Sequence, residues 1–271
     1  MLTNARGLIA VAALALGAVA CSGSDSGTTG QLVVRLTDSP TDNLQSATVW
    51  ISSVYLMGGT DTLGNRYVIT STPQAYDLLT LANGVTTQLG AGTIPVGEYT
   101  HMRLVVDSAR VTLKSGLTFT DGTSSKLLHV PSGQQTGIKV NFVGRLDVVP
   151  GQTILVVDFD VARNFIFMGT AAHPTGVIFR PVLYATVQDI AASIAGTVSP
   201  AAAKARLFAI FGADTVASAL ADSLTGAYTL RFLYPQTYTI AAAAEGYQPA
   251  TASVTVRAAQ DTTGVNFTLA P

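Results

Sequence analysis

Residues 31–38 read Gln31-Leu32-Val33-Val34-Arg35-Leu36-Thr37-Asp38, with Leu32, Val34 and Leu36 at every second position. Successive side chains of an extended chain point to opposite faces, so these three residues share one face. The same period of two recurs along most of the chain. It predicts a protein built of β-strands, each with one buried face.

The composition favours the same fold class. The 271 residues include 35 Thr, 14 Asp and only 2 Glu. Thr favours strands and Asp favours turns, whereas Glu favours helices. Charged residues make up 11% of the chain and the net charge is −1, which gives no basis for a nucleic-acid partner. Cys21 is the only cysteine, so the chain has no internal disulfide and must be stabilised by packed sheets.

Further strand candidates follow at short intervals, separated by turn signals such as Asn83-Gly84 and Pro150-Gly151. Their ranges are Ser46–Met57, Arg66–Thr70, Tyr99–Leu113 (a hairpin or a bent strand), Lys126–Val130, Gly137–Val143, Thr153–Val161 and Val177–Val187. Only Leu78–Asn83 and Ala201–Ala205 have a helical pattern, and both segments are short.

The sequence pattern changes near Asp189–Ala192, and residues 193–271 form a second unit. Its strand candidates are Ser193–Val198, Ala205–Phe211, Thr215–Ala221, Ala227–Phe232, Thr237–Ala244, Ala250–Val256 and Thr262–Leu269. Seven short strands in about 80 residues is the spacing of a sandwich. We therefore expect an all-β protein with two β-sandwich-like domains, residues 31–189 and 193–271, and we expect residues 193–271 to fold alone.

The N-terminal segment has the layout of a bacterial secretory signal. Arg6 precedes an apolar run from Leu8 to Ala20, which is too short to span a bilayer as a helix. Cys21 follows small residues directly, as at a lipoprotein cleavage site. We expect residues 1–20 to be a cleaved signal peptide, Cys21 to be lipidated, and residues 21–30 to be a flexible tether.

An ordinary secretory signal is the alternative, because Ala18-Val19-Ala20 also satisfies the rule for soluble secretion. Ala18 also stands where a lipoprotein signal usually has leucine. A lipid anchor places the protein in the cell envelope. In a cell with two membranes, Ser22 after the cysteine favours the outer membrane.

Residues 31–189 resemble a bacterial family known only as a domain of unknown function, DUF4382. The matching pieces, in the order of the family, are Leu36-Thr37-Asp38-Ser39-Pro40, Tyr76-Asp77-Leu78-Leu79-Thr80-Leu81-Ala82-Asn83-Gly84, Ile94-Pro95-Val96-Gly97-Glu98-Tyr99, Val130-Pro131-Ser132-Gly133, Gly137-Ile138-Lys139, Asp158-Phe159-Asp160-Val161-Ala162-Arg163 and Arg180-Pro181-Val182. The resemblance implies a secreted or lipid-anchored β-domain with no known activity. Asn164 stands where the family often has serine.

Residues 193–271 resemble the carboxypeptidase regulatory-like modules, which are small prealbumin-like sandwiches. The matching pieces are Ile194-Ala195-Gly196-Thr197-Val198, Gly226-Ala227-Tyr228-Thr229-Leu230, Pro235-Gln236-Thr237-Tyr238-Thr239-Ile240 and Glu245-Gly246-Tyr247. Gln236 replaces the usual glycine of a Pro-Gly-x-Tyr turn. Such modules are often grouped with carbohydrate-binding-like folds, but a fold does not establish a sugar site.

Asp158 and Asp160 are the sharpest chemical feature of the sequence. On a continuous strand they would stand side by side on one face, opposite Leu155, Val157 and Phe159. Two carboxylates that close repel each other and need compensation.

Two kinds of compensation are open. One is a cation such as Ca²⁺, with Asp38 as a third carboxylate ligand. The other is ion pairing with basic residues of the neighbouring motifs, which are Arg163, Arg180 and Lys139. We expect the ion pairs.

No catalytic or metal-binding motif accompanies this pair. His101, His129 and His173 fall in different segments without the spacing of metal ligands. Two carboxylates on one strand face also sit closer than a glycosidase normally uses. We therefore expect neither a cofactor nor a resident metal.

The sequence thus predicts a non-enzymatic, lipid-anchored envelope protein that acts in adhesion, surface structure or glycan binding, with a surface glycan or envelope protein as partner. The alternative is an envelope enzyme acting on polysaccharide. An enzyme needs a cleft with convergent, pKa-perturbed groups, whereas a flat face with aromatics favours binding. The aromatic candidates are Trp50, Tyr55, Tyr67, Tyr76 and Tyr99.

Overall fold

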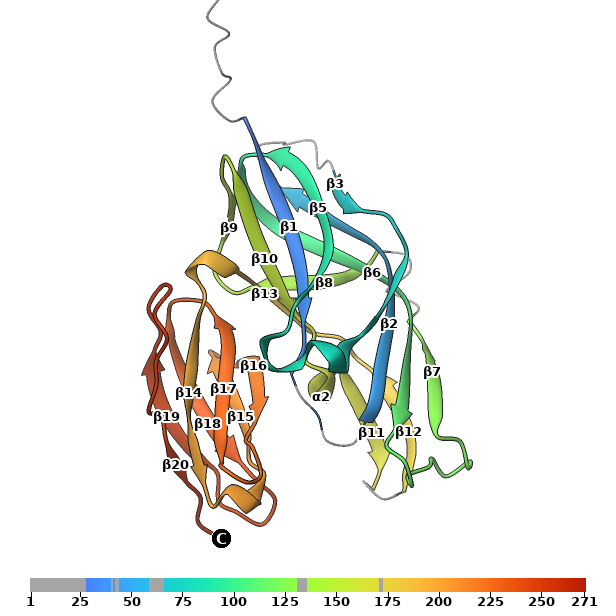
Figure 1. The fold of residues 1–271 in the computed structure, drawn as a ribbon. Coiled ribbons are helices and arrows are strands. Elements are labelled where there is room, and N and C mark those ends of the chain that lie inside the picture. The colour runs from blue at the N-terminus through green and yellow to red at the C-terminus, as the bar shows by residue number, and fades with distance from the viewer. Residues whose placement is uncertain (1–27, 40, 42–43, 59–65, 131–135, 171–172) are drawn as a thin grey trace, which may run out of the picture.

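The computed structural model describes residues 28–271, apart from residues 40, 42–43, 59–65, 131–135 and 171–172. The described chain is all-β and forms two bodies side by side, as the sequence predicts (Figure 1). Cys21, the expected signal segment and most of the expected tether lie outside the described residues. Within the described part of the chain, no helix is long and apolar enough to cross a membrane.

The first body is organised by one 11-stranded sheet. Its main path runs β3-β2-β6-β8-β13-β10-β1-β5, with β4 beside β2 and with β7 and β9 beside β6. The strands are β1 (Thr29–Thr37), β2 (Leu44–Gly58), β3 (Arg66–Thr70), β4 (Gln74–Asp77), β5 (Thr87–Pro95), β6 (Gly97–Leu113), β7 (Ser125–His129), β8 (Ile138–Phe142), β9 (Leu146–Val148), β10 (Gln152–Asp158) and β13 (Leu183–Val187).

Two glycines of β5 let this sheet curl until its edge strands β3 and β5 meet. A Cβ atom on Gly90 would lie 2.8 Å from the Cβ of Thr70, and one on Gly92 would lie 3.4 Å from the Cδ1 of Ile69. Only a residue without a side chain permits so close a backbone approach at Gly90. The curled sheet encloses one apolar core that includes Leu32 and Leu36.

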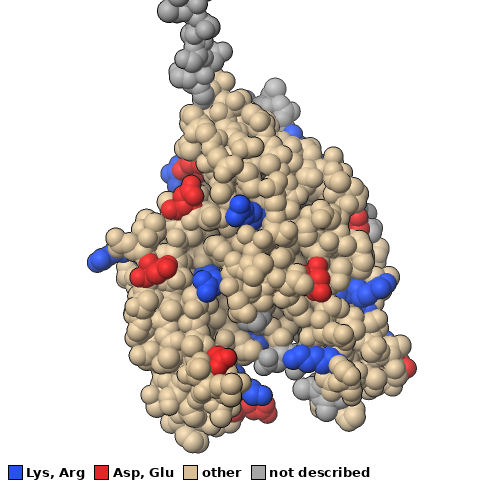
Figure 2. Space-filling model, in the orientation of Figure 1, with Lys and Arg blue, Asp and Glu red and all other residues tan. Residues whose placement is uncertain are grey.

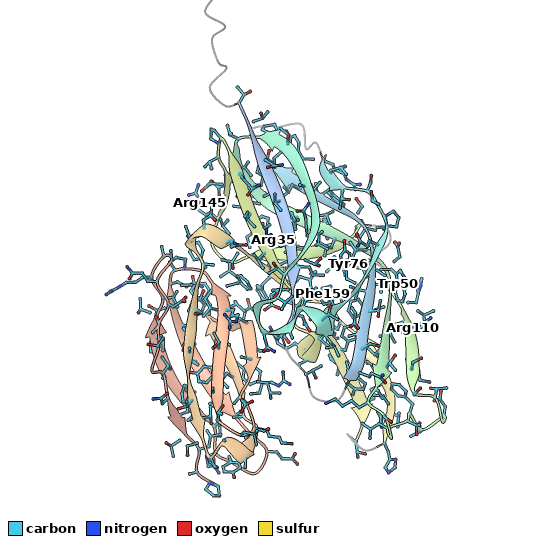
Figure 3. The ribbon with its side chains drawn as sticks, viewed as in Figure 1. Arg35, Trp50, Tyr76, Arg110, Arg145 and Phe159 are labelled. Atoms are coloured by element: carbon cyan, nitrogen blue, oxygen red, sulfur yellow. The ribbon has the colours of Figure 1, made fainter. Side chains whose placement is uncertain are left out.

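A hairpin of β11 (Phe165–Gly169) and β12 (Pro174–Phe179) closes one end of this core. The ring of Phe179 stacks on Phe159 at a centroid distance of 6.0 Å and contacts Phe165 at 4.8 Å. Phe159 has no exposed surface and lies at the centre of the first domain, beside the short helix α2 (Val161–Asn164) (Figure 3). The only other helical turns in the described residues are 3-10 helices: η1 (Leu78–Gly84), η2 (Gln188–Ile190) and η3 (Ala201–Ala203).

The second body is a sandwich of two sheets, in the orders β17-β14-β20 and β16-β15-β18-β19. The strands are β14 (Ala192–Ser199), β15 (Arg206–Phe211), β16 (Asp214–Leu220), β17 (Ala227–Leu233), β18 (Thr237–Ala243), β19 (Ala250–Thr255) and β20 (Phe267–Thr268). Its core includes Ile194, Leu230 and Ile240, all without exposed surface.

Several boundaries differ from the sequence predictions. The expected strand Val177–Val187 is two strands, because the chain leaves β12 at Arg180-Pro181 before β13 begins, and proline cannot donate to a ladder. The expected strand Thr153–Val161 ends at Asp158. Strand β1 begins at Thr29, inside the segment expected to be a tether.

The two domains share part of their packing. Val143, from the first domain, belongs to the buried core of the second, and Tyr184 packs against that same core. Tyr234 of the second domain lies directly over Gly144. A Cβ on Gly144 would approach the Cε2 of Tyr234 to 2.1 Å. Gly144 therefore permits the close contact of the two domains.

Replacing Gly144 with alanine tests this contact, with Gly151→Ala as a matched control. Both glycines have positive φ, +87° and +97°, so alanine strains the backbone at either position, by about 1–2 kcal/mol. Only Gly144 has a neighbouring ring, since nothing lies within 4 Å of a Cβ on Gly151. We expect Gly144→Ala to lose about 1–3 kcal/mol more free energy of unfolding than Gly151→Ala, measured by urea denaturation. Equal losses would contradict the contact.

Residues 193–271 expressed alone should show a cooperative thermal transition, because most of the second core lies within them. Its melting temperature should fall below that of the same domain in the full chain, since Val143 and Tyr184 are missing. Calorimetry of both proteins checks this. A fragment without a transition would show that the second core depends on the first domain.

Candidate functional site

The three carboxyl groups singled out in the sequence lie together at one edge of the large sheet. Strands β1 and β10 are parallel neighbours, with Thr37 opposite Asp158. The carboxyl ends of parallel strands meet at the same edge, so Asp38, directly after β1, reaches the end of β10. Asp160 follows two residues after Asp158. This edge of the sheet faces the second domain.

The expected arrangement of Asp158 and Asp160 on one strand face is wrong. Strand β10 ends at Asp158, and Asp160 has left-handed backbone angles (φ 44°, ψ 74°) and caps the N-terminus of α2. The Oδ1 atom of Asp158 accepts a hydrogen bond from the backbone N–H of Asp160 (3.2 Å). This local bond turns the chain out of the sheet, as Asp side chains commonly do at turns.

Asp160 joins the two domains. Its Oδ1 atom accepts from the backbone N–H of Arg163 (3.3 Å), and its Oδ2 atom accepts from the hydroxyl of Ser218 on β16 (2.8 Å). The carbonyl of Ser218 in turn accepts from the hydroxyl of Ser39 (2.9 Å). Asp160, Ser39 and Ser218 are all buried.

Asp38 is only 5% exposed, and only one of its two carboxyl oxygens has a hydrogen-bond partner. Its Oδ1 atom accepts from the backbone N–H of Val161 (2.8 Å), but its Oδ2 atom is buried without a hydrogen-bond partner. A buried, unpaired charged oxygen is costly, which favours the protonated form of this carboxyl group.

Burial raises the pKa values of all three carboxyl groups, and repulsion by neighbouring carboxylates adds to the shift of Asp38 and Asp158. Desolvation raises the pKa of Asp38 well above its usual range, and the charges of Asp158 and Asp160 raise it further. The pKa of Asp158 rises to about 8, first by desolvation and then by the charge of Asp160. Desolvation also raises the pKa of Asp160, against the hydrogen bond from Ser218 and the charges of Arg163 and Arg206.

Only one of the three expected basic partners lies near the carboxyl groups. The charge of Arg163 lowers the pKa of both Asp158 and Asp160, while its guanidinium donates to the carbonyl of Thr215 on β16. Arg180 is exposed after β12, and Lys139 lies on β8 beside Arg103.

None of the expected ion pairs is among the salt bridges of the described residues. Those salt bridges are Lys126–Asp121, Arg145–Glu98 and Arg145–Asp147. Across the described ranges, no group of three or more His, Cys, Asp or Glu side chains is placed to hold a metal ion.

A cleft of about 660 Å³ opens between the two domains beside this cluster. Its walls come from the ends of β1, β6 and β10, from η1, and from β16 and β17. Polar residues supply much of the lining: Thr37, Asp38, Ser39, Asn83, Lys114, Asp158, Lys204, Ser218, Asp222, Ser223, Thr229 and Arg231. Asp158 is half-buried and lines this cleft.

The aromatic candidates form no flat platform on the surface. Tyr55, Tyr76 and Tyr99 are buried. Tyr67 packs edge-on against Tyr99 at 5.5 Å, and Trp50 is half-buried with the guanidinium of Arg110 5.7 Å from its ring (Figure 3). The structure thus has a cleft with convergent, pKa-shifted groups and not an aromatic face built from these residues.

Sequence reasoning missed the contributions of the second domain to the site. Ser218 lies in an alternating strand whose pattern gives no sign that one hydroxyl bonds to another domain. Arg206 is the first residue of β15, and its Nη1 atom is buried without a hydrogen-bond partner. Its charge lowers the pKa of Asp160. A basic residue at the start of a buried strand was the one available signal.

The raised pKa values make the protein less stable as pH rises. The three carboxyl groups bind protons more tightly in the folded state than in the unfolded chain, and this difference stabilises the fold. The stabilisation from these groups is complete below about pH 4 and is lost as pH rises towards 8. The lowered pKa of Asp121, about 2, and that of Asp222 act in the opposite sense, below this window. We expect the free energy of unfolding from urea titrations to fall between pH 4 and 8.

Asp38→Asn should make this fall shallower, because it removes one of three mutually repelling carboxyl groups and keeps an oxygen for the Val161 N–H. Asp147→Asn, at an exposed carboxylate, is the control and should leave the slope unchanged. A wild-type protein whose stability is flat from pH 4 to 8 would contradict the buried, protonated cluster.

No curated protein matches this chain. Among solved structures, the chain is similar to the Bacillus anthracis TIE protein with 9% sequence identity and a TM-score of 0.22. That match covers 89% of this chain and 33% of the other, so the chain spans about a third of the length of that protein. A TM-score this low supports no conclusion about fold or function.

Two family models match the chain in the predicted order. The carboxypeptidase regulatory-like domain matches residues 193–270. The model described as a domain of unknown function, DUF4382, matches residues 29–181, more than half of the chain. The cluster of Asp38, Asp158 and Asp160 lies within the DUF4382 match, and Ser218 lies within the carboxypeptidase regulatory-like match. The protein is therefore a member of the DUF4382 family that carries a carboxypeptidase regulatory-like domain after its family domain.

Proposed function

We propose that this protein is a lipid-anchored component of the bacterial cell envelope, in the outer membrane where the cell has two membranes, with a non-catalytic binding or structural role. The anchor rests on Cys21, the only cysteine, which directly follows an apolar run and small residues. Adhesion and glycan binding are the roles that fit a protein held at a membrane with two β-domains beyond it.

The cleft between the domains is the observation that carries the binding role. Ligand sites are concave and occur preferentially where domains meet. This cleft has about 660 Å³ and is lined by side chains from both domains. The exposed charges on the face seen in Figure 2 are sparse and scattered, so that face offers no single charged patch as a competing site.

An envelope enzyme acting on polysaccharide is the second candidate, and it is favoured by the feature that an enzyme needs, a cleft with pKa-shifted groups. Asp158 borders the cleft with a pKa near 8, which would keep its carboxyl group protonated and able to act as a general acid at neutral pH. Its neighbours Asp38 and Asp160 are buried and committed to backbone and domain contacts. The second carboxylate that a glycosidase needs is therefore less available than the first.

The anchor is tested by phase partition of the protein in Triton X-114. Wild-type protein from membranes should enter the detergent phase, because an acyl chain adds about 0.8 kcal/mol per buried methylene. Cys21→Ala should enter the aqueous phase and keep its signal segment uncleaved at this site. Ser22→Ala is the control and should partition like wild type. Wild-type protein found in the aqueous phase would refute the anchor.

The enzyme candidate is tested by incubating the purified protein with each polysaccharide that it binds. Under the binding role, the reducing ends should not increase with time. Release of new reducing ends that disappears in Asp158→Asn would establish the enzyme.

A further inference from the structure

The interdomain cleft carries a group of three cations, of which Arg231 also interacts with the charge of Asp261. Lys114, Lys204 and Arg231 line it, all three are exposed, and none of them is in a salt bridge of the described residues. In a chain with only 15 lysines and arginines, three on one cleft is a concentration of positive charge.

The acidic residues of the cleft offset this charge only in part. Asp158 is protonated at neutral pH because its pKa lies near 8, and Asp38 is buried with its pKa raised. Hydrogen bonds from the backbone N–H groups of Thr225 and Leu224 lower the pKa of Asp222, so this carboxylate stays ionised and offsets one of the three positive charges. The open part of the cleft is therefore positive at neutral pH, and anionic ligands are favoured.

One aromatic residue in the cleft, Phe232, has an unusual backbone conformation. Phe232 has φ +54°, a conformation that bulky side chains rarely adopt, and it is half-buried. It sits at a bulge, where Arg231 and Phe232 of β17 stand opposite Ser193 alone. Phe232 lines the cleft and belongs to the apolar core of neither domain. Strained residues of this kind cluster at ligand sites.

We propose that this cleft binds an anionic saccharide, with Phe232 against the apolar face of a sugar ring and Arg231, Lys204 and Lys114 facing its acidic groups. The proposal rests on the binding role proposed above and names its ligand class. An aromatic ring buries the C–H face of a sugar, and a guanidinium binds carboxylate or sulfate with two parallel hydrogen bonds. Asn83 and Ser223, on opposite walls, supply polar groups for hydroxyls.

A peptide added as an extra strand fits the cleft less well. The second domain borders it with two edge strands, β16 and β17. The carbonyl groups of Thr215 and Ser218 on β16 already accept hydrogen bonds from Arg163 and Ser39 of the first domain. The bulge at Phe232 interrupts the regular ladder of β17, which discourages strand addition. The cleft therefore recognises its ligand through side chains.

The first experiment presents the full chain, in detergent micelles, to a glycan array of uronate-bearing, sulfated and neutral oligosaccharides. The hits should be acidic, and the uronate and sulfate arms distinguish the two sources of negative charge. Affinity for the strongest hit, measured by calorimetric titration, should fall as NaCl rises from 50 to 500 mM, because salt screens exposed charges.

The second experiment tests the site with matched variants. Phe232→Ala should weaken binding about tenfold, whereas Phe211→Ala, an exposed phenylalanine outside the cleft, should bind like wild type. Arg231→Ala should weaken binding severalfold and flatten its salt dependence, whereas Arg257→Ala should change neither. Thermal melts confirm that each variant is folded. Phe232→Tyr, which keeps the ring, should retain affinity even if Phe232→Ala is unstable.

The outcomes separate this proposal from the proposed function. Acidic glycans that bind Phe232→Ala and Arg231→Ala as tightly as wild type would overturn the site and leave the binding role standing. Hits confined to neutral glycans would overturn the ligand class. An array without any hit would overturn the saccharide ligand altogether, while detergent partition of wild-type protein would still support the envelope anchor. A synthetic peptide that competes for the cleft would favour strand addition instead.

Discussion

The parallel pairing of β1 with β10 is the constraint on which the rest of this structure depends. Its register sets Thr37 opposite Asp158, so the chain leaves both strands at the same edge of the sheet. Asp158 ends β10 at that edge, and Asp38 and Asp160 follow within two residues of it. Their burial under the second domain is tolerated because a proton can neutralise a carboxyl group at little structural cost, whereas three bare carboxylates in that space would repel. The edge thus becomes a place where the domains meet and where protonation affects stability.

The same junction also protects a vulnerable strand. Strand β16 is the edge of its sheet, and free carbonyl groups on an edge invite pairing with other chains. Ser39 and Arg163 of the first domain donate to two of those carbonyl groups. Tyr234 and Gly144 complete the contact at a second point. The domains therefore meet through specific polar bonds and one tight ring contact, and they leave a polar cleft where the surfaces diverge.

Much of the fold could be predicted from sequence because buried strands impose a period of two. Strand β3 matches its predicted range to the residue, and six of the seven predicted strands of the second domain match within a few residues, the exception being the short β20. Strand β5 was missed because glycines and threonines dilute its alternation. The break at Pro181 was missed because apolar residues continue on both sides of it. Periodicity does not indicate which strands pair, so it could not predict the parallel register of β1 and β10.

The candidate site was predictable to the same limited extent. Asp158 and Asp160 stood out because a spacing of two places them on one face of a continuous strand. Asp38 was added as a third carboxylate, and Arg163 as a basic residue of a neighbouring motif. The strand geometry predicted for the pair was wrong, since the Asp158 side chain bonds to the backbone of Asp160 and ends the strand. Ser218 and Arg206 come from another domain, and a docking geometry depends on surface shapes that no local pattern encodes. The cleft, which exists only once both domains are placed, was invisible for the same reason.

The position of β1 has a mechanical consequence. In the proposed anchored protein, β1 begins eight residues after the lipidated cysteine and lies between β10 and β5 in the sheet. A pull on the anchor would act along β1 and load its hydrogen bonds to both neighbours in shear, all at once, and not one after another. The opposite end of β1 lies beside α2 (Figure 1), and Thr37 at that end lines the interdomain cleft. Tension between the membrane and a ligand held in that cleft would be carried along β1. This is the direction in which the sheet best resists a load.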